Sequence, residues 1–153
     1  MSFSGKSNDT VDTWVINDGL WPNLQVAEFQ KTYRLPAEYA LELVVDGLRT
    51  AMSEVNQDLQ HRRQEFIALG IAYLEDAEQD QVPNLPFVVA TYKRAVYCRA
   101  KADLLPQFAT INRRPEAANL AKEAPETREL FLAYSQRAIR LLQSRGRITA
   151  VLL

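Results

Sequence analysis

One long amphipathic segment, from Pro36 to Leu69, constrains the fold more than any other feature of the chain. Its apolar side chains recur at alternating steps of four and three residues, interrupted only by Arg62; they are Leu41, Val45, Leu48, Met52, Val55, Leu59, Phe66 and Leu69. This spacing puts them on one face of an α-helix, and the segment is too long and too regular for a strand. The sequence therefore predicts a long helix at the core of an all-α fold.

Prolines mark the expected starts of several helices. At the first helical position the missing N–H of proline costs nothing, and its fixed φ angle is already helical. The starts marked in this way are Pro36, Pro86, Pro115 and Pro125. They predict a bundle of about four helices arranged around one long central helix.

Caps and breakers set the boundaries of the first and third helices. A short helix is expected from Asn23 to Tyr33, capped by its first residue and burying Val26 and Phe29. The third helix is expected from Pro86 to about Leu105, because apolar side chains recur there every four residues. Pro106 should then end or kink this helix.

The last helix and the tail that follows it have different characters. The helix is expected from Pro125 to Ser144, with Gly146 stopping it. It should bury Leu130, Phe131, Tyr134, Ala138, Leu141 and Leu142. The closing residues favour an extended strand whose free backbone groups a partner can satisfy; they are Ile148, Thr149, Ala150, Val151, Leu152 and Leu153. We expect this tail to dock on a partner, the alternative being that it folds back and completes the core.

Residues 1–22 have no helical period and are interpreted as an N-terminal arm. Val11 to Ile16 could form a short strand, and Asn17 to Gly19 has the composition of a turn. Trp14 and Trp21 must cover something, either their own bundle or a partner, and the sequence leaves both open. The chain thus divides into an arm (1–22), a helical bundle (23–145) and an extended tail (146–153).

Composition indicates a single globular domain. The chain has 153 residues, of which 47% are hydrophobic and 24% charged. Cys98, its one cysteine, excludes an internal disulfide and is expected to be a packed thiol. No apolar stretch approaches the roughly 20 residues needed to cross a bilayer, and the N-terminus lacks the apolar core of a secretory signal. We therefore expect a cytoplasmic protein with no membrane contact.

Charge is distributed unevenly along the chain, although its net value is −1. Residues 1–60 carry four basic side chains against nine acidic ones, and residues 111–153 carry eight basic against four acidic. This polarity suits head-to-tail contacts between copies or contact with an acidic partner, unless solvated helix faces merely differ in charge. The basic candidates for subunit contact or for facing DNA are Arg137, Arg140, Arg145 and Arg147.

The sequence contains no set of residues in the spacing of a known catalytic or ligand-binding motif, so the chain is not expected to be an enzyme. His61 is its one histidine and lies between polar neighbours, which favours an exposed position over a catalytic base. No metal or cofactor is expected, since one histidine, one cysteine and scattered carboxylates and glycines match no known ligand pattern. The sequence pI of about 5.9 disfavours a dedicated DNA-reading domain, although loose backbone contact stays possible.

Five segments in a fixed order carry a resemblance to a known family; they are Trp21 to Leu24, Tyr33 to Pro36, Ala51 to Leu59, Tyr92 to Val96 and Ile148 to Leu153. Together they resemble the head completion proteins of tailed bacteriophages, the GPL family. The series covers most of the chain from residue 21 onward. The sequence departs from the family pattern at Leu105 to Phe108, where charged residues continuing the helix are expected.

The resemblance implies a structural protein of the virion neck that acts by binding alone. Such a protein assembles in the host cytoplasm as a homo-oligomeric ring, twelvefold to match the portal, under the portal of the DNA-filled head. It would contact the portal protein through residues 148–153 and offer a surface to the next neck or tail-terminator protein, while genomic DNA passes through its channel. The alternative is a DNA-binding helical accessory protein of phage packaging, which the basic last third of the chain would explain.

Overall fold

The computed structural model of the protein describes residues 12–111 and 127–151. Within them the chain is mostly helical, with five α-helices, one 3₁₀ helix and a small two-stranded sheet. The elements are β1 (Trp14–Val15), β2 (Leu24–Gln25), α1 (Val26–Thr32), α2 (Leu41–Asp58), α3 (Gln60–Ala68), η1 (Leu74–Asp76), α4 (Leu85–Ile111) and α6 (Arg128–Val151). The expected helix starts at Pro115 and Pro125 lie outside the described residues.

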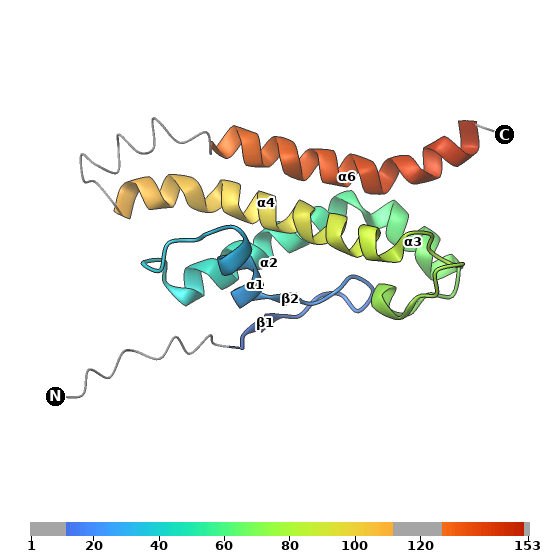
Figure 1. Ribbon diagram of the computed structural model, residues 1–153, viewed down its shortest axis with the longest axis horizontal. Coiled ribbons are helices and arrows are strands. Elements are labelled where there is room, and N and C mark those ends of the chain that lie inside the picture. The colour runs from blue at the N-terminus through green and yellow to red at the C-terminus, as the bar shows by residue number, and fades with distance from the viewer. Residues whose placement is uncertain (1–11, 112–126, 152–153) are drawn as a thin grey trace.

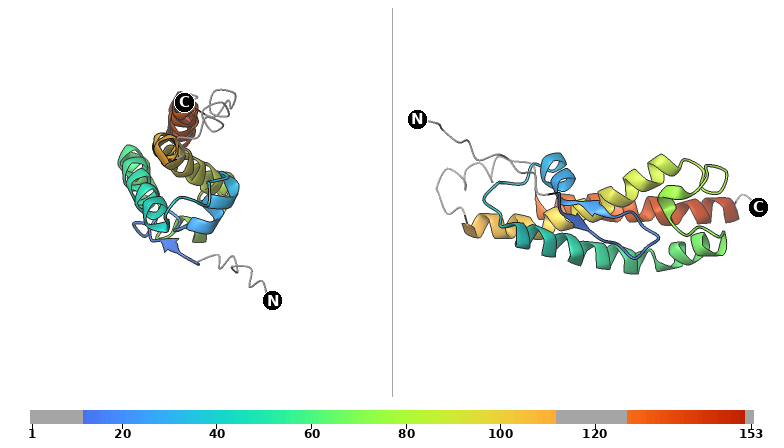
Figure 2. Two further views of the ribbon diagram at one scale, coloured as in Figure 1. Left: turned by 90° about the vertical axis from the view of Figure 1, so that its left-hand side faces the viewer. Right: turned by 90° about the horizontal axis from the view of Figure 1, so that it is seen from below.

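The helix α4 lies in the middle of the molecule (Figure 1). α6 and α2 pack on different sides of it, and α1 with the β1–β2 hairpin covers a further side (Figure 2). Core side chains occur all around α4, among them Val88, Tyr92, Val96, Ala100 and Leu104. The central helix is therefore α4, and the sequence-based assignment of that place to residues 36–69 was wrong. A helix with core side chains on most of its sides suits the centre, whereas a one-sided stripe suits a flank.

The predicted long helix is present as two helices, α2 and α3, with a break at Leu59. The φ and ψ angles of Leu59 are −97° and 11°, so one residue leaves the helical range while its side chain stays buried. The helix begins at Leu41 rather than Pro36, because residues 36–39 form a turn in which the Tyr39 N–H donates to the Pro36 carbonyl at 3.3 Å. The Tyr39 hydroxyl donates to the Leu104 carbonyl at 2.7 Å and ties this turn to α4.

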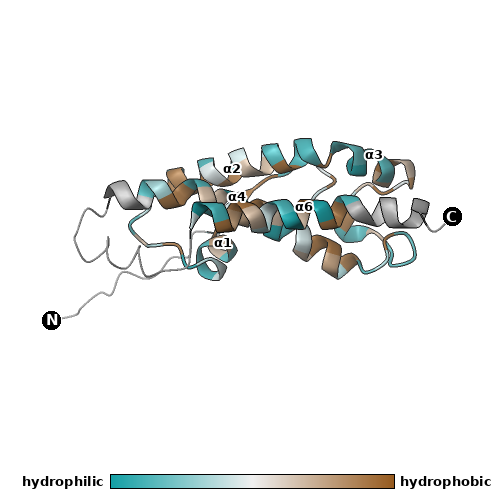
Figure 3. Cartoon of the chain, turned by 90° about the horizontal axis from the view of Figure 1, so that it is seen from above, coloured by the Kyte–Doolittle hydropathy of each residue, from teal (hydrophilic) through white to brown (hydrophobic). Residues whose placement is uncertain are grey.

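The apolar stripe itself was correctly placed over most of its length. The side chains of Leu48, Met52, Val55, Leu59 and Phe66 are all buried. Leu41 and Val45, near the start of α2, are half-buried, and Leu69 is 56% exposed. Figure 3 shows hydrophilic residues along the outward side of α2 and on α3, as expected for an amphipathic pair of helices on the flank of a bundle.

The predicted helix ends at Leu105 and Gly146 were wrong, whereas the alternative that Pro106 kinks its helix stays a prediction. α4 continues through Pro106 to Ile111, and α6 continues through Gly146 to Val151. In a helix interior a proline costs about 3 kcal/mol and a glycine about 1 kcal/mol relative to alanine, and tertiary packing routinely offsets such costs. The extended tail is thus helical over residues 146–151, and residues 152–153 lie outside the described part.

The described part of the N-terminal arm, residues 12–22, packs against the helices. β1 and β2 form an antiparallel hairpin in which Trp14 lies opposite Gln25 and Val15 opposite Leu24. At its turn Gly19 has a φ of +100°, a left-handed conformation that glycine adopts without strain. α1 begins at Val26, so the prediction of Asn23 as its cap was wrong. The Asn23 side chain instead accepts from the Asn17 N–H at 2.8 Å and braces the hairpin loop.

Candidate interaction surface

A groove of about 320 Å³ lies between α4 and α6. Its floor consists of the buried side chains of Cys98, Phe131 and Ala138, beside the half-buried Tyr33. Its walls carry Tyr134, which is 37% exposed, and Leu141, which is 42% exposed. Arg94 of α4 and Arg137 of α6 also line it, both with exposed side chains. We call this feature the α4–α6 groove.

Buried polar contacts hold the helices that form the groove. The Ser135 hydroxyl of α6 donates to the Ala95 carbonyl of α4 at 2.7 Å. The Lys101 ammonium is buried, donates to the Tyr33 carbonyl at 2.6 Å and lies 4.8 Å from the centre of the Phe131 ring. Leaving a buried polar group without its partner costs free energy, so these contacts fix α6 and the end of α1 on α4. The groove is therefore a preformed part of the fold.

The arginines of the groove are available for a partner. Neither Arg94 nor Arg137 forms an ion pair with a carboxylate of the described residues, and the same holds for Arg140 on the next turn of α6. An exposed guanidinium presents five donors that match a carboxylate or a phosphate. The groove thus combines an apolar floor with a cationic rim that no carboxylate of residues 12–111 or 127–151 pairs with.

Cys98 belongs to the floor of the groove as a packed side chain. Its Sγ lies 3.6 Å from the hydroxyl oxygen of Tyr33, and burial raises the pKa of its thiol. A thiol with a raised pKa holds its proton at neutral pH and is a poor nucleophile. The prediction of a packed rather than a reactive cysteine is confirmed in geometry.

A second surface, which we call the acidic end, begins in the last turn of α3 and continues beyond it. Ile67, Leu69 and Tyr73 are all about half exposed, at 46%, 56% and 58%. They are followed by four exposed carboxylates, none of which forms an ion pair with another described residue; these are Glu75, Asp76, Glu78 and Asp80. The acidic end therefore has apolar and anionic side chains within fourteen consecutive residues, 67–80.

A third surface is a polar cleft of about 710 Å³ between the hairpin loop and α2. Asn17, Ser53, Asn56 and Gln57 line it, and three of these belong to the segment Ala51 to Leu59 that carries part of the family resemblance. The apolar members of that segment are buried, and Met52 among them also borders the cleft. The same stretch of α2 therefore contributes apolar side chains to the core and polar side chains to the surface.

The residues predicted to make contacts differ in position. Arg137 and Arg140 are exposed on α6, while Arg145 and Arg147 lie on the same helix with side chains outside the described part. Of the two tryptophans, Trp21 is 2% exposed and belongs to the core, whereas Trp14 is 49% exposed. Trp21 therefore covers its own bundle, and a partner contact by Trp14 stays a prediction.

Sequence reasoning missed the groove because it placed Tyr134 and Leu141 in the core. Their spacing fits an apolar helix face, and periodicity does not separate buried positions from half-buried ones at the edge of that face. With Arg137 they form a set at steps of three and four residues, and this shared face of α6 was the available signal. Arg94 gave no signal, because its place beside the groove depends on how α6 packs against α4.

The described residues also limit what chemistry the surface can perform. Among them, no three His, Cys, Asp or Glu side chains gather closely enough to hold a metal ion. His61 is exposed on α3, where its Nε2 lies 3.2 Å from Glu65. A bilayer could not be spanned by any helix in this part of the chain, since none combines the necessary length and apolar character.

Comparison with known proteins gives a consistent similarity over nearly the whole chain. The family described as phage head completion protein (GPL) matches residues 15–153. The chain is 30% identical over 145 residues to a probable head completion/stabilization protein of Haemophilus phage HP1, covering 95% of both chains. It is 26% identical over 92 residues to the head completion/stabilization protein of Escherichia phage P2, covering 60% of this chain and 54% of that protein. No solved structure matches the chain significantly.

Proposed function

Because this chain belongs to the family of phage head completion proteins (GPL), we propose that it completes the DNA-filled head by forming a ring beneath the portal. The ring stabilises the filled head, offers a docking surface to the next neck or tail-terminator protein, and lets the genome pass through its channel. Its mechanism is binding, with no catalytic step. The subunits assemble in the host cytoplasm and remain in the neck of the virion.

The observation that carries the proposal is the α4–α6 groove on a chain matched by the family over residues 15–153. A preformed groove with an apolar floor and exposed arginines at its rim has the mixed character of a protein–protein contact surface. The acidic end provides a second surface of opposite charge on the same subunit. A subunit that must contact copies of itself and two further proteins needs several separate surfaces of this kind.

Portal docking is assigned to residues 148–153. Because residues 148–151 continue α6, docking by addition of a strand no longer fits this segment. A helix that lays one face into a groove of the partner does fit it. The sequence of this segment, with Ile148, Val151, Leu152 and Leu153 after Arg145 and Arg147, provides the apolar character and the positive charge that such docking requires.

Mass measurement of the purified chain, with and without the portal protein of the same phage, tests the proposal. We expect a complex with one copy of the chain per portal subunit. Deletion of residues 148–153 should abolish this complex without changing the melting temperature, whereas deletion of residues 2–7 at the other terminus serves as the matched control. A chain that stays monomeric and leaves the portal unbound would contradict the proposal.

The second candidate function is DNA binding during packaging, and the exposed Arg137 and Arg140 on α6 favour it. A DNA-binding accessory protein should bind free duplex DNA tightly, and its affinity should fall steeply between about 50 and 200 mM salt. A ring subunit that only surrounds the genome should bind free duplex DNA weakly over the same range. Measuring the affinity as a function of salt concentration separates the two.

A further inference from the structure

Nearly half of the carboxylates in the acidic first part of the chain are paired inside the subunit. Four of the nine carboxylates in residues 1–60 form ion pairs with cations from residues 61–110; the pairs are Asp18 with Arg63, Glu28 with Lys93, and Glu54 and Asp58 with Arg99. These contacts join the hairpin loop, α1 and α2 to α3 and α4. The charge of the first part is therefore a poor guide to which surface is free to attract the basic α6 of another copy.

The acidic end, in contrast, is held rigidly with its charges outward. Ile71 and Leu74 are buried within it, and the Leu74 N–H donates to the Leu20 carbonyl at 2.9 Å. Between and after these anchors the exposed Tyr73, Glu75 and Asp76 project from the molecule. An aromatic side chain next to carboxylates, displayed on an ordered segment, loses little conformational entropy when it binds.

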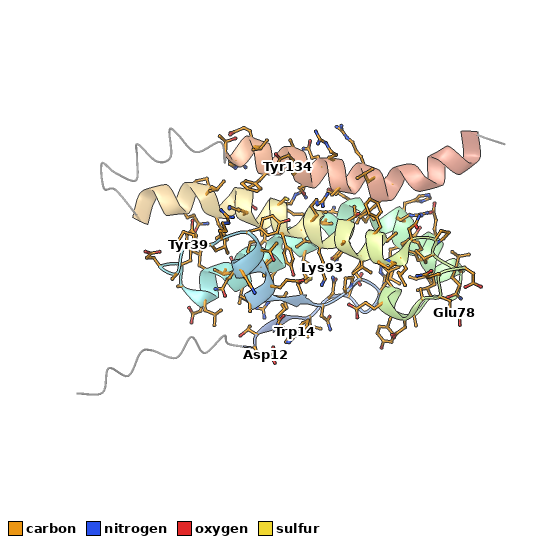
Figure 4. The ribbon with its side chains drawn as sticks, viewed as in Figure 1. Asp12, Trp14, Tyr39, Glu78, Lys93 and Tyr134 are labelled. Atoms are coloured by element: carbon orange, nitrogen blue, oxygen red, sulfur yellow. The ribbon has the colours of Figure 1, made fainter. Side chains whose placement is uncertain are left out.

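The α4–α6 groove has the complementary chemistry. It offers Tyr134 and Leu141 as apolar contacts, and Arg94 and Arg137 as cations that form no ion pair within the described part of the chain. Tyr134 lies on α6, whereas Glu78 lies at the far end of the molecule beyond α3 (Figure 4). Because the two surfaces are distinct and separated, a contact between them must join two different copies of the chain.

We propose that the acidic end of one copy docks in the α4–α6 groove of the next. Tyr73 enters the groove against Tyr134 and Leu141, and the carboxylates of Glu75 and Asp76 meet Arg94 and Arg137. A contact between two unlike surfaces repeats from copy to copy and forms a ring when the rotation closes. This inference rests on the proposed ring and specifies which surfaces build it.

Another acidic surface competes for the same role and is less suited to it. Glu38, Glu42 and Asp46 are exposed at the start of α2 and form no ion pair with a described residue. No large apolar side chain of the described residues is strongly exposed beside them, the strongly exposed ones being elsewhere. This surface can match the arginines of the groove but not its apolar floor, and it provides the matched control.

Cross-linking tests which surfaces meet. The full chain carrying Tyr73→Cys and Leu141→Cys is oxidised at concentrations where the ring forms, alone and with the portal protein. We expect a ladder of disulfide-linked oligomers, whereas Asp46→Cys with Leu141→Cys should give none. Cys98 lies on the floor of the same groove, so both double variants also carry Cys98→Ala. Two results would overturn the inference and leave the proposed ring intact. Either rings form normally but Tyr73→Cys with Leu141→Cys gives no linked oligomers, or only the control pair gives them.

Charge reversal gives an independent measurement. Arg137→Glu should weaken assembly about tenfold at low salt and less at high salt, because the contact is exposed and screened. Adding Glu75→Arg to Arg137→Glu should restore assembly, whereas adding Asp46→Arg should not. Equal rescue by both would overturn the inference. Absence of any oligomer in the wild-type chain, even with portal, would instead overturn the proposed ring together with it.

Discussion

The indole ring of Trp21 stacks on the phenol ring of Tyr92, with centroids 4.8 Å apart and planes inclined by 3°. Tyr92 also belongs to a closed set of three hydrogen bonds. Its hydroxyl donates to Asn56 Oδ1 at 2.6 Å, Asn56 Nδ2 donates to Asn17 Oδ1 at 2.8 Å, and Asn17 Nδ2 donates to the Tyr92 hydroxyl at 2.7 Å. One side chain of α4 thus joins the N-terminal hairpin and α2 to the core.

Replacing Trp21 should test this junction. Trp21→Ala removes the stack on Tyr92 and the edge contact with Phe66, so we expect a loss of about 3–5 kcal/mol in the free energy of unfolding. The half-exposed Trp14 provides the matched control, and Trp14→Ala should change stability by less than about 1 kcal/mol. Chemical denaturation followed by circular dichroism measures both. Similar losses for the two variants would contradict the placement of Trp21 in the core.

A second prediction concerns the register of α2. Met52 is 6% exposed in the core, so Met52→Asp buries an unpaired carboxylate and should unfold the domain at ordinary temperature. Its neighbour Ser53 is exposed, and Ser53→Asp should leave the melting temperature nearly unchanged. Thermal unfolding of the two variants gives the answer. A Met52→Asp variant as stable as the wild type would show that α2 is rotated from the register described.

Local sequence signals predicted the helices well and their ends poorly. The apolar steps from Leu48 to Phe66 identify the buried face of α2 and α3, because packing requires that spacing. The predicted start at Pro36 and the predicted ends at Leu105 and Gly146 were wrong, because a proline or a glycine sets only a local free-energy cost for the helix. Whether a helix stops there depends on packing against distant segments, which the sequence does not display.

The same limit explains which surfaces were found. Arg137 and Arg140 were identified because charge is a property of the residue itself. The α4–α6 groove was not, because it exists only where Arg94, Cys98 and Phe131 meet across two helices. The difference in burial between Trp14 and Trp21 also depends on tertiary structure, since both residues lie in a segment without helical period.

A third prediction concerns alkaline pH. Burial raises the pKa of Tyr33, Tyr92 and Tyr97 well above the ordinary value of about 10, and a hydrogen bond to Glu28 adds to this effect at Tyr97. The unfolded chain releases these protons near pH 10 while the folded chain holds them. Their contribution to stability is therefore complete below about pH 10 and is lost as the pH rises above it.

Melting temperatures measured from about pH 8 to pH 11 test this dependence, together with tyrosinate absorbance. Stability should be flat at first and then fall, and ionisation of the three tyrosines should accompany unfolding. Tyr97→Phe removes one of the three hydroxyls and should make the fall less steep. Full tyrosine ionisation in a chain that stays folded would contradict the burial of these rings.

The last prediction tests whether α6 continues through Gly146 or stops there. Alanine in a helix interior is favoured over glycine by about 0.5–1 kcal/mol, so Gly146→Ala should stabilise the end of α6. Gly70 is the matched control: its φ is +81°, in the left-handed region, and Gly70→Ala should destabilise the protein by about 1 kcal/mol. Amide hydrogen exchange along α6 and thermal unfolding measure the two effects. Opposite signs would support a continuous helix, whereas a loss of stability in both variants would mean that Gly146 ends the helix in a left-handed conformation.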